Sequence, residues 1–176
     1  ERVQRLDRRH PREIEVAELV DNALDAGASR VDVAVAGDGT DRVRVADDGR
    51  GMSRADAERA VERHATSKLA PDGDPVGVAS LGFRGEALAA IADAARLELV
   101  TSVDGDAGTR VVADGTASDA GPRVAVEPAG HARGTTVVVE DLFATRPARR
   151  ESLASPTAEF ARISSLVADY ALANPG

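Results

Sequence analysis

The chain of 176 residues has the length of one ordinary domain, and its 30 Asp and Glu residues outnumber 22 Lys and Arg residues to give a formal net charge of -8. A surface this acidic repels DNA phosphates at low salt. The chain contains no cysteine, which excludes disulfides, thiolate metal sites and cysteine nucleophiles.

The rest of the composition sets the kind of core and leaves the source open. Hydrophobic residues make up 43% of the chain and aromatic residues only 2%, so the core must consist of Val, Leu, Ile and Ala. Lys68 is the single lysine. An acidic, lysine-poor chain is typical of a salt-rich cytoplasm, but a GC-rich genome also exchanges lysine for arginine, and composition does not separate the two.

The sequence also indicates where the protein is found. No apolar run approaches the length needed to span a membrane, and the charged start over residues 1–5 does not resemble a signal peptide. We therefore expect a cytoplasmic protein. The missing initiator Met and the turn-like residues 174–176 predict that residues 1–176 are a single domain cut from a longer chain.

A helix and a hairpin are predicted first in chain order. Residues 12–26 form the helix because apolar side chains recur there at helical spacing, and Gly27 follows as a C-cap. The apolar positions are Val16, Leu19, Val20, Ala23 and Leu24. Residues 31–35 and 42–45 alternate between apolar and polar side chains around a turn at 37–40, which predicts a hairpin.

The middle of the chain predicts two helices separated by a long loop. Ser53 begins the first of these helices, with Asp56 in the position of a capping box, and the helix is expected to run to about Ala65. Residues 66–85 are rich in Gly and Pro, and so long a loop inside a compact domain is usually either functional or disordered. A short helix is expected from residue 86 to about residue 94.

Strands dominate the later part of the sequence. They are predicted at residues 97–101, 109–112, 124–126 and 135–139, and a last helix at residues 157–173. Because helices cluster early and strands late, the pattern predicts an α+β fold, a two-layer sandwich of helices on a mixed, mainly antiparallel sheet.

The first helix carries an acidic stripe opposite its apolar one. Glu18, Asp21, Asn22 and Asp25 recur at a spacing that places them on one face. The carboxylates repel one another there, and no basic residue on that face offsets them. Such a stripe suits Mg²⁺ with its bound waters, and a neighbouring carboxylate would take a proton from an attacking water. The alternative is a solvated acidic face of an amphipathic helix.

Two glycine-containing segments predict a ligand site. Asp47 precedes Gly49 and Gly51, which permit a tight turn and close approach of a ligand, while the Asp accepts a hydrogen bond from an amine such as that of adenine. Residues 82–88 lead from a loop into a helix, where backbone N–H groups favour an anion. The second segment lacks the Gly-Lys-Ser/Thr of a P-loop. An ordinary Asp-Gly turn and a simple helix start are the alternatives.

Five segments in this order resemble the gyrase, histidine-kinase and MutL ATPase superfamily, whose Bergerat-type fold is the sandwich expected above. They are residues 18–28, 47–52, 63–68, 82–88 and 134–137. Within that superfamily, residues 63–68 and 82–88 resemble the MutL mismatch-repair proteins, as do 141–143 and 147–150. The resemblance covers about residues 12–153 and implies the N-terminal ATPase domain of such a protein.

The resemblance assigns roles to single residues. Glu18 would be the general base toward the hydrolytic water, and Asn22 would hold Mg²⁺ through its side-chain oxygen. Asp47 would bind the amine of the adenine in ATP, while Gly49 and Gly51 would let the base approach.

Further nucleotide contacts are implied by the same resemblance. A lid over the phosphates would come from Thr66, Ser67, Lys68 and the segment Arg84, Gly85, Glu86, Ala87 and Leu88. Met52, Gly82 and Phe83 complete the expected contacts, with Thr135 or Thr136 near the adenine. Arg63 and His64 would brace the lid rather than take part in the chemistry.

The chain departs from the family pattern in ways that affect the expected activity. Asp48 stands where the family often has Asn, which does not threaten binding, and residues 144–146 differ from the usual stretch. Residues 1–10 do not match the family's N-terminal segment, which helps form the ATP-dependent dimer. The second domain, which supplies a lysine to the γ-phosphate, is also absent from the chain. Hydrolysis by this chain alone is therefore expected to be slow.

The resemblance implies Mg-dependent ATP binding and hydrolysis as a conformational and dimerisation switch in DNA mismatch repair. The implied partners are a second copy of the protein, a MutS-like mismatch sensor and the DNA backbone. This chain would contact the DNA backbone weakly, through Arg146, Arg149 and Arg150. The alternative is that these arginines are solvated surface charges, which the negative net charge favours. The alternatives are a nucleotide-binding dimerisation module without turnover, a topoisomerase or chaperone ATPase, and a histidine kinase, for which too few residues precede the first motif.

Overall fold

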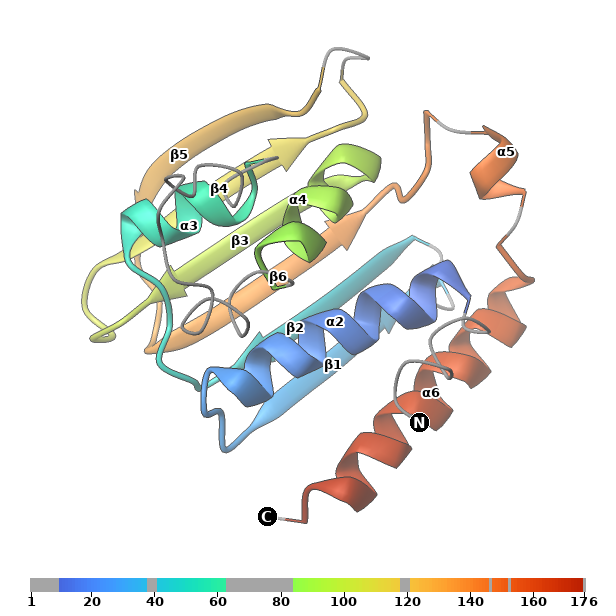
Figure 1. Ribbon diagram of the computed structural model, residues 1–176, viewed down its shortest axis with the longest axis horizontal. Coiled ribbons are helices and arrows are strands. Elements are labelled where there is room, and N and C mark those ends of the chain that lie inside the picture. Colours follow the sequence, from blue (N-terminus) through green and yellow to red (C-terminus); the bar gives the residue numbers. More distant parts are fainter. Residues whose placement is uncertain are drawn as a thin grey trace, which may run out of the picture.

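The computed structural model describes residues 10–37, 41–62, 84–117, 121–145, 147–151 and 153–175, which form two layers (Figure 1). The strands are β1 (Val31–Ala36), β2 (Arg42–Asp47), β3 (Arg96–Ser102), β4 (Gly108–Asp114), β5 (Arg123–Ala129) and β6 (Gly134–Glu140). The helices are α2 (Pro11–Asp25), α3 (Arg54–Ala60), α4 (Arg84–Ala94), α5 (Pro147–Arg150) and α6 (Pro156–Ala173). Among them no helix is both long and apolar enough to cross a membrane.

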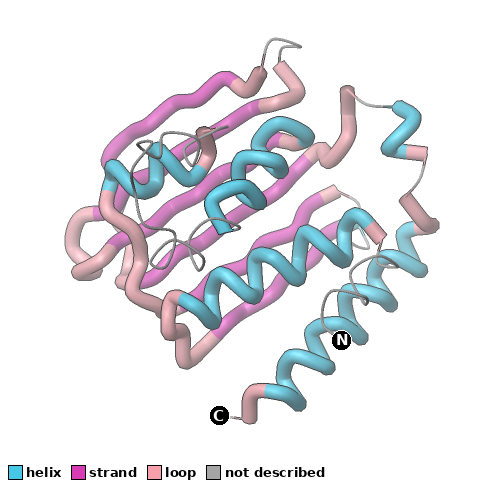
Figure 2. The backbone as a smooth tube through the Cα atoms, in the orientation of Figure 1, coloured by secondary structure: helices cyan, strands magenta, loops and turns pink. Residues whose placement is uncertain are grey.

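The six strands form one sheet in the order β1-β2-β6-β3-β4-β5, and helices cover one face of it (Figure 2). Each neighbouring pair is antiparallel, which confirms the predicted helix-on-sheet sandwich with a mainly antiparallel sheet; no parallel pair occurs among the described strands. β6, the last strand in the chain, lies between β2 and β3 and joins the early hairpin to the later strands.

Helix α2 forms as predicted and ends in a Schellman motif. Gly27 adopts a positive φ of 74° directly after the helix. Its N–H donates to the carbonyl of Leu24 at 3.0 Å, and the N–H of Ala28 donates to the carbonyl of Ala23 at 3.2 Å. Gly27 thus ends the helix because it reverses the backbone and satisfies the last carbonyl groups.

Two helix boundaries differ from those predicted. Ser53 caps α3 by accepting a hydrogen bond from the N–H of Asp56, as expected, but the helix ends at Ala60 instead of about Ala65. The backbone turns out of the helix at Val61, whose side chain is 1% exposed and belongs to the core. Residues 63–65 of the predicted extension lie outside the described residues. Helix α4 begins at Arg84, two residues before the predicted start.

The core lies between the sheet and the helices and is aliphatic, as the composition required. The strands alternate, so that every second residue points toward the helices. The fully buried aliphatic residues on this face of the strands are Val43, Leu97, Leu99, Val111, Ala113 and Val139. From the helix layer, α2 and α4 contribute Val16, Leu19, Val20, Leu88, Ile91 and Ala92, and α6 contributes Ile163 and Leu166.

Charged groups are buried where α2 and α6 begin, which the sequence analysis did not predict. The Arg12 guanidinium donates to the Glu15 carboxylate at 2.9 Å, and both residues are buried. On α6, Glu159 is also fully buried and accepts a hydrogen bond from the N–H of Ala154 at 2.8 Å. A helical pattern alone cannot predict such residues, because their partners come from the fold.

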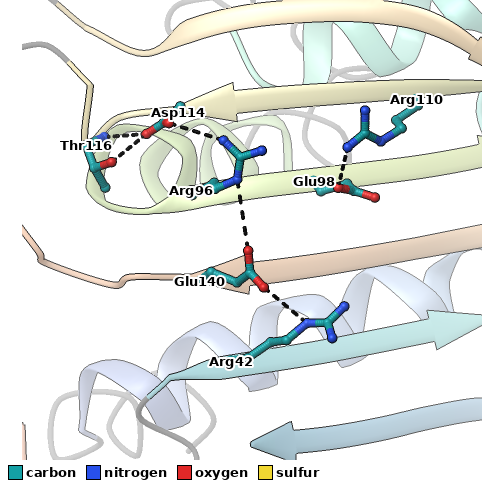
Figure 3. A network of polar contacts seen from close by, with 7 residues as sticks. All are labelled: Arg42, Arg96, Glu98, Arg110, Asp114, Thr116 and Glu140. Atoms are coloured by element: carbon teal, nitrogen blue, oxygen red, sulfur yellow. Dashed lines mark hydrogen bonds and ion pairs between the residues drawn. The ribbon is translucent and has the colours of Figure 1, made fainter.

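The uncovered face of the sheet carries a cross-strand row of alternating charge (Figure 3). The strand register places Arg42, Glu140, Arg96, Asp114 and Arg123 side by side across five strands. Arg96 lies 3.2 Å from Asp114, and Arg42 lies 3.4 Å from Glu140. Opposite charges on neighbouring strands stabilise this register, and they neutralise much of the face locally.

Because Leu99 is fully buried on the helix-facing side of the sheet, we predict that shortening its side chain strongly lowers stability. We expect Leu99→Ala to lower the free energy of unfolding by about 2–5 kcal/mol, because it leaves a cavity in a well-packed core. Val124→Ala, at a strand position that is 45% exposed, should change it by less than about 0.5 kcal/mol. Urea denaturation of both variants measures the difference, and equal losses would show that this face is not the core.

Candidate functional site

A row of polar side chains crosses one end of the sheet on the face that the helices cover. The register pairs Asp47 of β2 with Thr135 of β6, Thr135 with Thr101 of β3, and Thr101 with Thr109 of β4. A carboxylate and three hydroxyl groups therefore follow one another across four strands. Elsewhere on this face the strand residues are aliphatic, so the row marks a change from core to candidate site.

The Asp47 carboxylate is half-buried at the end of β2. It accepts a hydrogen bond from the backbone N–H of Gly49 at 2.9 Å. Burial raises the pKa of Asp47, and the backbone N–H groups of Gly49 and Thr135 act in the opposite direction. The group is held in place by the backbone and is suited to accept a hydrogen bond from a ligand.

Asp48 ties the glycine turn to the end of α2. Its carboxylate accepts hydrogen bonds from the Ser29 hydroxyl at 2.5 Å, the N–H of Arg30 at 2.8 Å and the N–H of Ser29 at 2.7 Å. These bonds lower the pKa of Asp48, and the bond from the Ser29 hydroxyl contributes most. The N–H of Arg50 also donates to the carbonyl of Ala26 at 3.0 Å. The segment after α2 and the turn after β2 are therefore one connected unit, and Asp48 fills its position in the family pattern without disturbing the turn.

Gly51 and Gly134 lie where no side chain fits. Gly51 has a positive φ of 67°, and a Cβ atom there would lie 2.0 Å from the carbonyl oxygen of Ser102. A Cβ atom on Gly134 would lie 2.0 Å from the carbonyl oxygen of Asp47. The turn thus packs directly against the backbone of β3, and β6 packs against β2. These glycines are required by the fold itself, before any ligand is considered.

Three groups converge on the buried hydroxyl of Thr101. The backbone N–H of Met52 donates to it at 2.9 Å, and it lies 3.0 Å from the carbonyl of Gly134 and 3.0 Å from the Thr135 hydroxyl. Thr136, the other candidate near the ligand, points to the opposite face, where its hydroxyl lies 3.0 Å from His131 Nε2. Of the two threonines, Thr135 is the one on the Asp47 face.

The acidic stripe of α2 lies on the side of the helix away from the core. Glu18 is half-buried, and its pKa is raised by burial and further by the charge of Asp21. Asp21 accepts a hydrogen bond from the Tyr170 hydroxyl of α6 at 2.9 Å. A carboxylate with a raised pKa is better matched to accepting a proton than an ordinary exposed Glu, so Glu18 has the property expected of a general base.

Asn22 offers an amide that the protein does not fully use. Its Nδ2 atom is buried and has no hydrogen-bond partner among the residues that the structure describes. Within the described part of the chain, no group of three or more His, Cys, Asp or Glu side chains is arranged to hold a metal. The group of Asn22 that suits Mg²⁺ is its side-chain oxygen, because the ion takes one or two protein oxygens and completes its shell with water and phosphate. The Nδ2 atom is a donor and would not contact a cation.

Several predicted residues are only partly described. Thr66, Ser67, Lys68, Gly82 and Phe83 lie outside the described residues. Arg84, Gly85 and Glu86 form the first turn of α4, where the backbone alone is described. Ala87 is half-buried and Leu88 is in the core, so the Leu88 side chain is used for packing.

Two site residues were missed by the sequence analysis. Thr101 lay in a predicted strand without a role, and Tyr170 lay in the last helix. For Thr101 a signal was present, since it follows Leu97 and Leu99 on the alternating apolar side of the strand, where a hydroxyl requires partners. Tyr170 gave no signal, because its contact with Asp21 joins residues far apart in the sequence.

Comparisons with known proteins show which proteins the chain resembles. Residues 10–132 match the family described as histidine kinase-, DNA gyrase B- and HSP90-like ATPase. The DNA mismatch repair protein MutL of Halobacterium salinarum is 51% identical over 163 residues, which cover 91% of this chain and 24% of that protein. MutL of Anaeromyxobacter sp. (strain K) is 49% identical over 161 residues, which cover 91% of this chain and 26% of that protein. The chain thus spans about a quarter of the length of these curated relatives.

Solved structures show the same fold. The Aquifex aeolicus MutL ATPase domain complexed with ADP has a TM-score of 0.68 and 27% identity, covering 94% of this chain and 56% of that one. The N-terminal domain of a DNA repair protein has a TM-score of 0.73 and 28% identity, and the match covers 91% of this chain and 46% of that one.

The raised pKa of Glu18 predicts that this carboxylate opposes folding near neutral pH. The folded state holds the Glu18 proton more tightly than the unfolded chain, so stability is lost as pH rises through the folded pKa. We expect Glu18→Gln to be more stable than the wild type at neutral pH, with an advantage that shrinks toward the ordinary pKa of 4.5.

Urea denaturation between roughly pH 4 and pH 7 measures this dependence. The exposed Glu62→Gln serves as the matched control for the loss of one carboxylate. A Glu18→Gln advantage that is the same at every pH would contradict the assignment.

Proposed function

We propose that this chain, which belongs to the histidine kinase-, DNA gyrase B- and HSP90-like ATPase family, binds ATP with Mg²⁺ and hydrolyses it as a switch in DNA mismatch repair. The polar row at the end of the sheet would receive the adenine, and the acidic face of α2 would meet the phosphates. The observation that carries the proposal is the half-buried Asp47 carboxylate, held beside Thr135 by the strand register and by the N–H of Gly49.

Base recognition follows from the hydrogen-bonding capacity of this row. An ionised carboxylate only accepts hydrogen bonds, and the exocyclic amine of adenine donates two. Asp47 would therefore bind the amine, with Thr135 beside it. Gly49, Gly51 and Met52 would line the base from the turn. The ADP complex of the Aquifex aeolicus MutL ATPase domain, a related fold, supports a nucleotide as the ligand.

Hydrolysis would be carried out by the α2 face. Glu18 would take a proton from the attacking water, for which its raised pKa is suited. Asn22 would hold Mg²⁺ through its side-chain oxygen, and the ion, when bound, would neutralise phosphate charge. Asp21, fixed by Tyr170, would support Glu18 electrostatically.

The phosphates would be covered by a lid drawn from the sequence motifs. Thr66, Ser67 and Lys68 would provide side-chain donors and a positive charge. The start of α4, residues 84–88, would provide backbone N–H groups and the positive end of an 11-residue helix. Because ATP would bind the closed state more tightly than the open one, the lid would couple binding to a change of conformation.

The switch would act through partners. We propose that the chain is the N-terminal ATPase domain of a longer cytoplasmic protein. ATP binding would favour pairing of two such domains, and a MutS-like mismatch sensor would act upstream. DNA contact would be weak in this chain and made to the backbone, through arginines such as the exposed Arg150. A dimerisation module that binds ATP without turnover is the second candidate, and the raised pKa of Glu18 favours turnover over it.

Binding tests the base site. We expect isothermal titration calorimetry to detect Mg-dependent binding of a non-hydrolysable ATP analogue by the wild type and its loss in Asp47→Ala, because that variant removes the acceptor for the amine. The matched control is Asp32→Ala, an exposed Asp on the other face of the sheet, which should bind like the wild type. Undiminished binding by Asp47→Ala would rule out this carboxylate as the adenine contact.

Turnover tests the role of Glu18 separately. We expect Glu18→Ala to bind the analogue with nearly unchanged affinity and to release phosphate from ATP about 10²–10⁴-fold more slowly, the usual contribution of a general base. Phosphate release under saturating ATP measures this, with Glu62→Ala as an exposed control. Wild-type hydrolysis at the rate of Glu18→Ala would favour the module without turnover.

A further inference from the structure

The hydroxyl of Thr101 has a position that the proposed function does not yet use. Thr101 lies on β3 and is 0% exposed, whereas its neighbour Thr135 on β6 is 8% exposed and shares the face of Asp47. Thr101 is therefore too deeply buried to touch a ligand. Any effect of Thr101 on a ligand must pass through its neighbours, of which Thr135 presents a side-chain hydroxyl on the Asp47 face.

The three contacts of this hydroxyl admit one arrangement of hydrogens that satisfies all of them. A threonine hydroxyl has one hydrogen to donate and two lone pairs to accept with. The N–H of Met52 can only donate, so it occupies one lone pair at 2.9 Å. The carbonyl of Gly134 can only accept, so it takes the hydrogen at 3.0 Å. The remaining contact with Thr135, also 3.0 Å, is then a hydrogen bond that Thr135 donates.

This arrangement fixes how Thr135 faces the site. Its one hydrogen is directed at Thr101, so toward the site its oxygen offers lone pairs only. Asp47, its cross-strand partner, is likewise an acceptor. Two adjacent acceptors with no donor between them match a base edge that presents two N–H hydrogens, as an exocyclic amino group does.

We propose that Thr101 is a positioning residue that holds the Thr135 hydroxyl as an acceptor, and that the site thereby selects a base carrying an amino group. The inference rests on the proposed function, because it assumes that the base lies against Asp47 and Thr135. It adds a residue that acts on specificity without contacting the ligand.

The test compares two ligands that differ only in the amino group. Calorimetry measures the dissociation constants of ADP and of purine riboside 5′-diphosphate, which lacks the 6-amino group. We expect the wild type to bind ADP at least about tenfold more tightly, since the amino group makes two hydrogen bonds.

In Thr101→Val the Thr135 hydrogen is free to turn toward the base, and the preference should fall by about tenfold. Thr101→Ser should restore it. Thr116→Val, beyond the opposite end of β4, removes a hydroxyl that donates to Asp114 outside the row and should keep the wild-type preference.

If Thr101→Val does not fold, a second variant, Thr135→Val, still tests the proposal. Thr135→Val removes the acceptor itself, so it should weaken ADP and leave the purine riboside diphosphate unchanged. Equal weakening of both ligands would mean that Thr135 contacts a part that they share, and would overturn the proposal. So would an unchanged preference in a folded Thr101→Val. If the wild type bound neither ligand, both the proposed function and this inference would fail. If the wild type bound ADP and Thr101→Val kept the wild-type preference for ADP, only this inference would fail.

Discussion

The close backbone contact between the turn after β2 and the ends of β3 and β6 is the constraint on which the site depends. Gly134 brings β6 against the carbonyl of Asp47, and Gly51 brings the turn against the carbonyl of Ser102. A Cβ atom at either glycine would push the strands apart and remove Asp47 from its place beside Thr135. The glycines of a motif that resembles a ligand loop therefore act first on the fold, and space for a ligand follows from that packing.

The same turn joins the two layers of the domain. Asp48 accepts hydrogen bonds from the segment after α2, so the residues that would bind the base and those that would act on the phosphates are attached to one another. Helix α2 carries Glu18 and Asn22 on one side while its other side is core, which fixes their orientation through packing instead of a flexible loop. The position of Glu18 also lowers stability, because the burial that raises its pKa makes its charged form unfavourable in the folded state.

Local patterns were sufficient for most elements, and the reasons are specific. Alternation predicted the strands because most side chains on the helix face of β2, β3, β4 and β6 are buried, and Gly27 predicted the end of α2 because few other residues adopt its backbone conformation. Long-range pairing was not predictable in this way. Neither the place of β6 between β2 and β3 nor the contact of Tyr170 with Asp21 has a local signature. The buried Glu159 was missed for the same reason, because its hydrogen-bond partner is supplied by the folded chain.

The distribution of charge, more than its total, bears on how such a domain meets nucleic acid. On the uncovered sheet face, Arg42, Arg96 and Arg110 each lie against a carboxylate, so their charges are largely neutralised before any phosphate approaches. An extended DNA-binding surface there would have to break these pairs in a chain whose net charge is already -8. Each pair is weak by itself, but together they fix the register that aligns Asp47 with Thr135 at the other end of the strands. The open face is therefore better explained as structural support for the site than as a second binding surface.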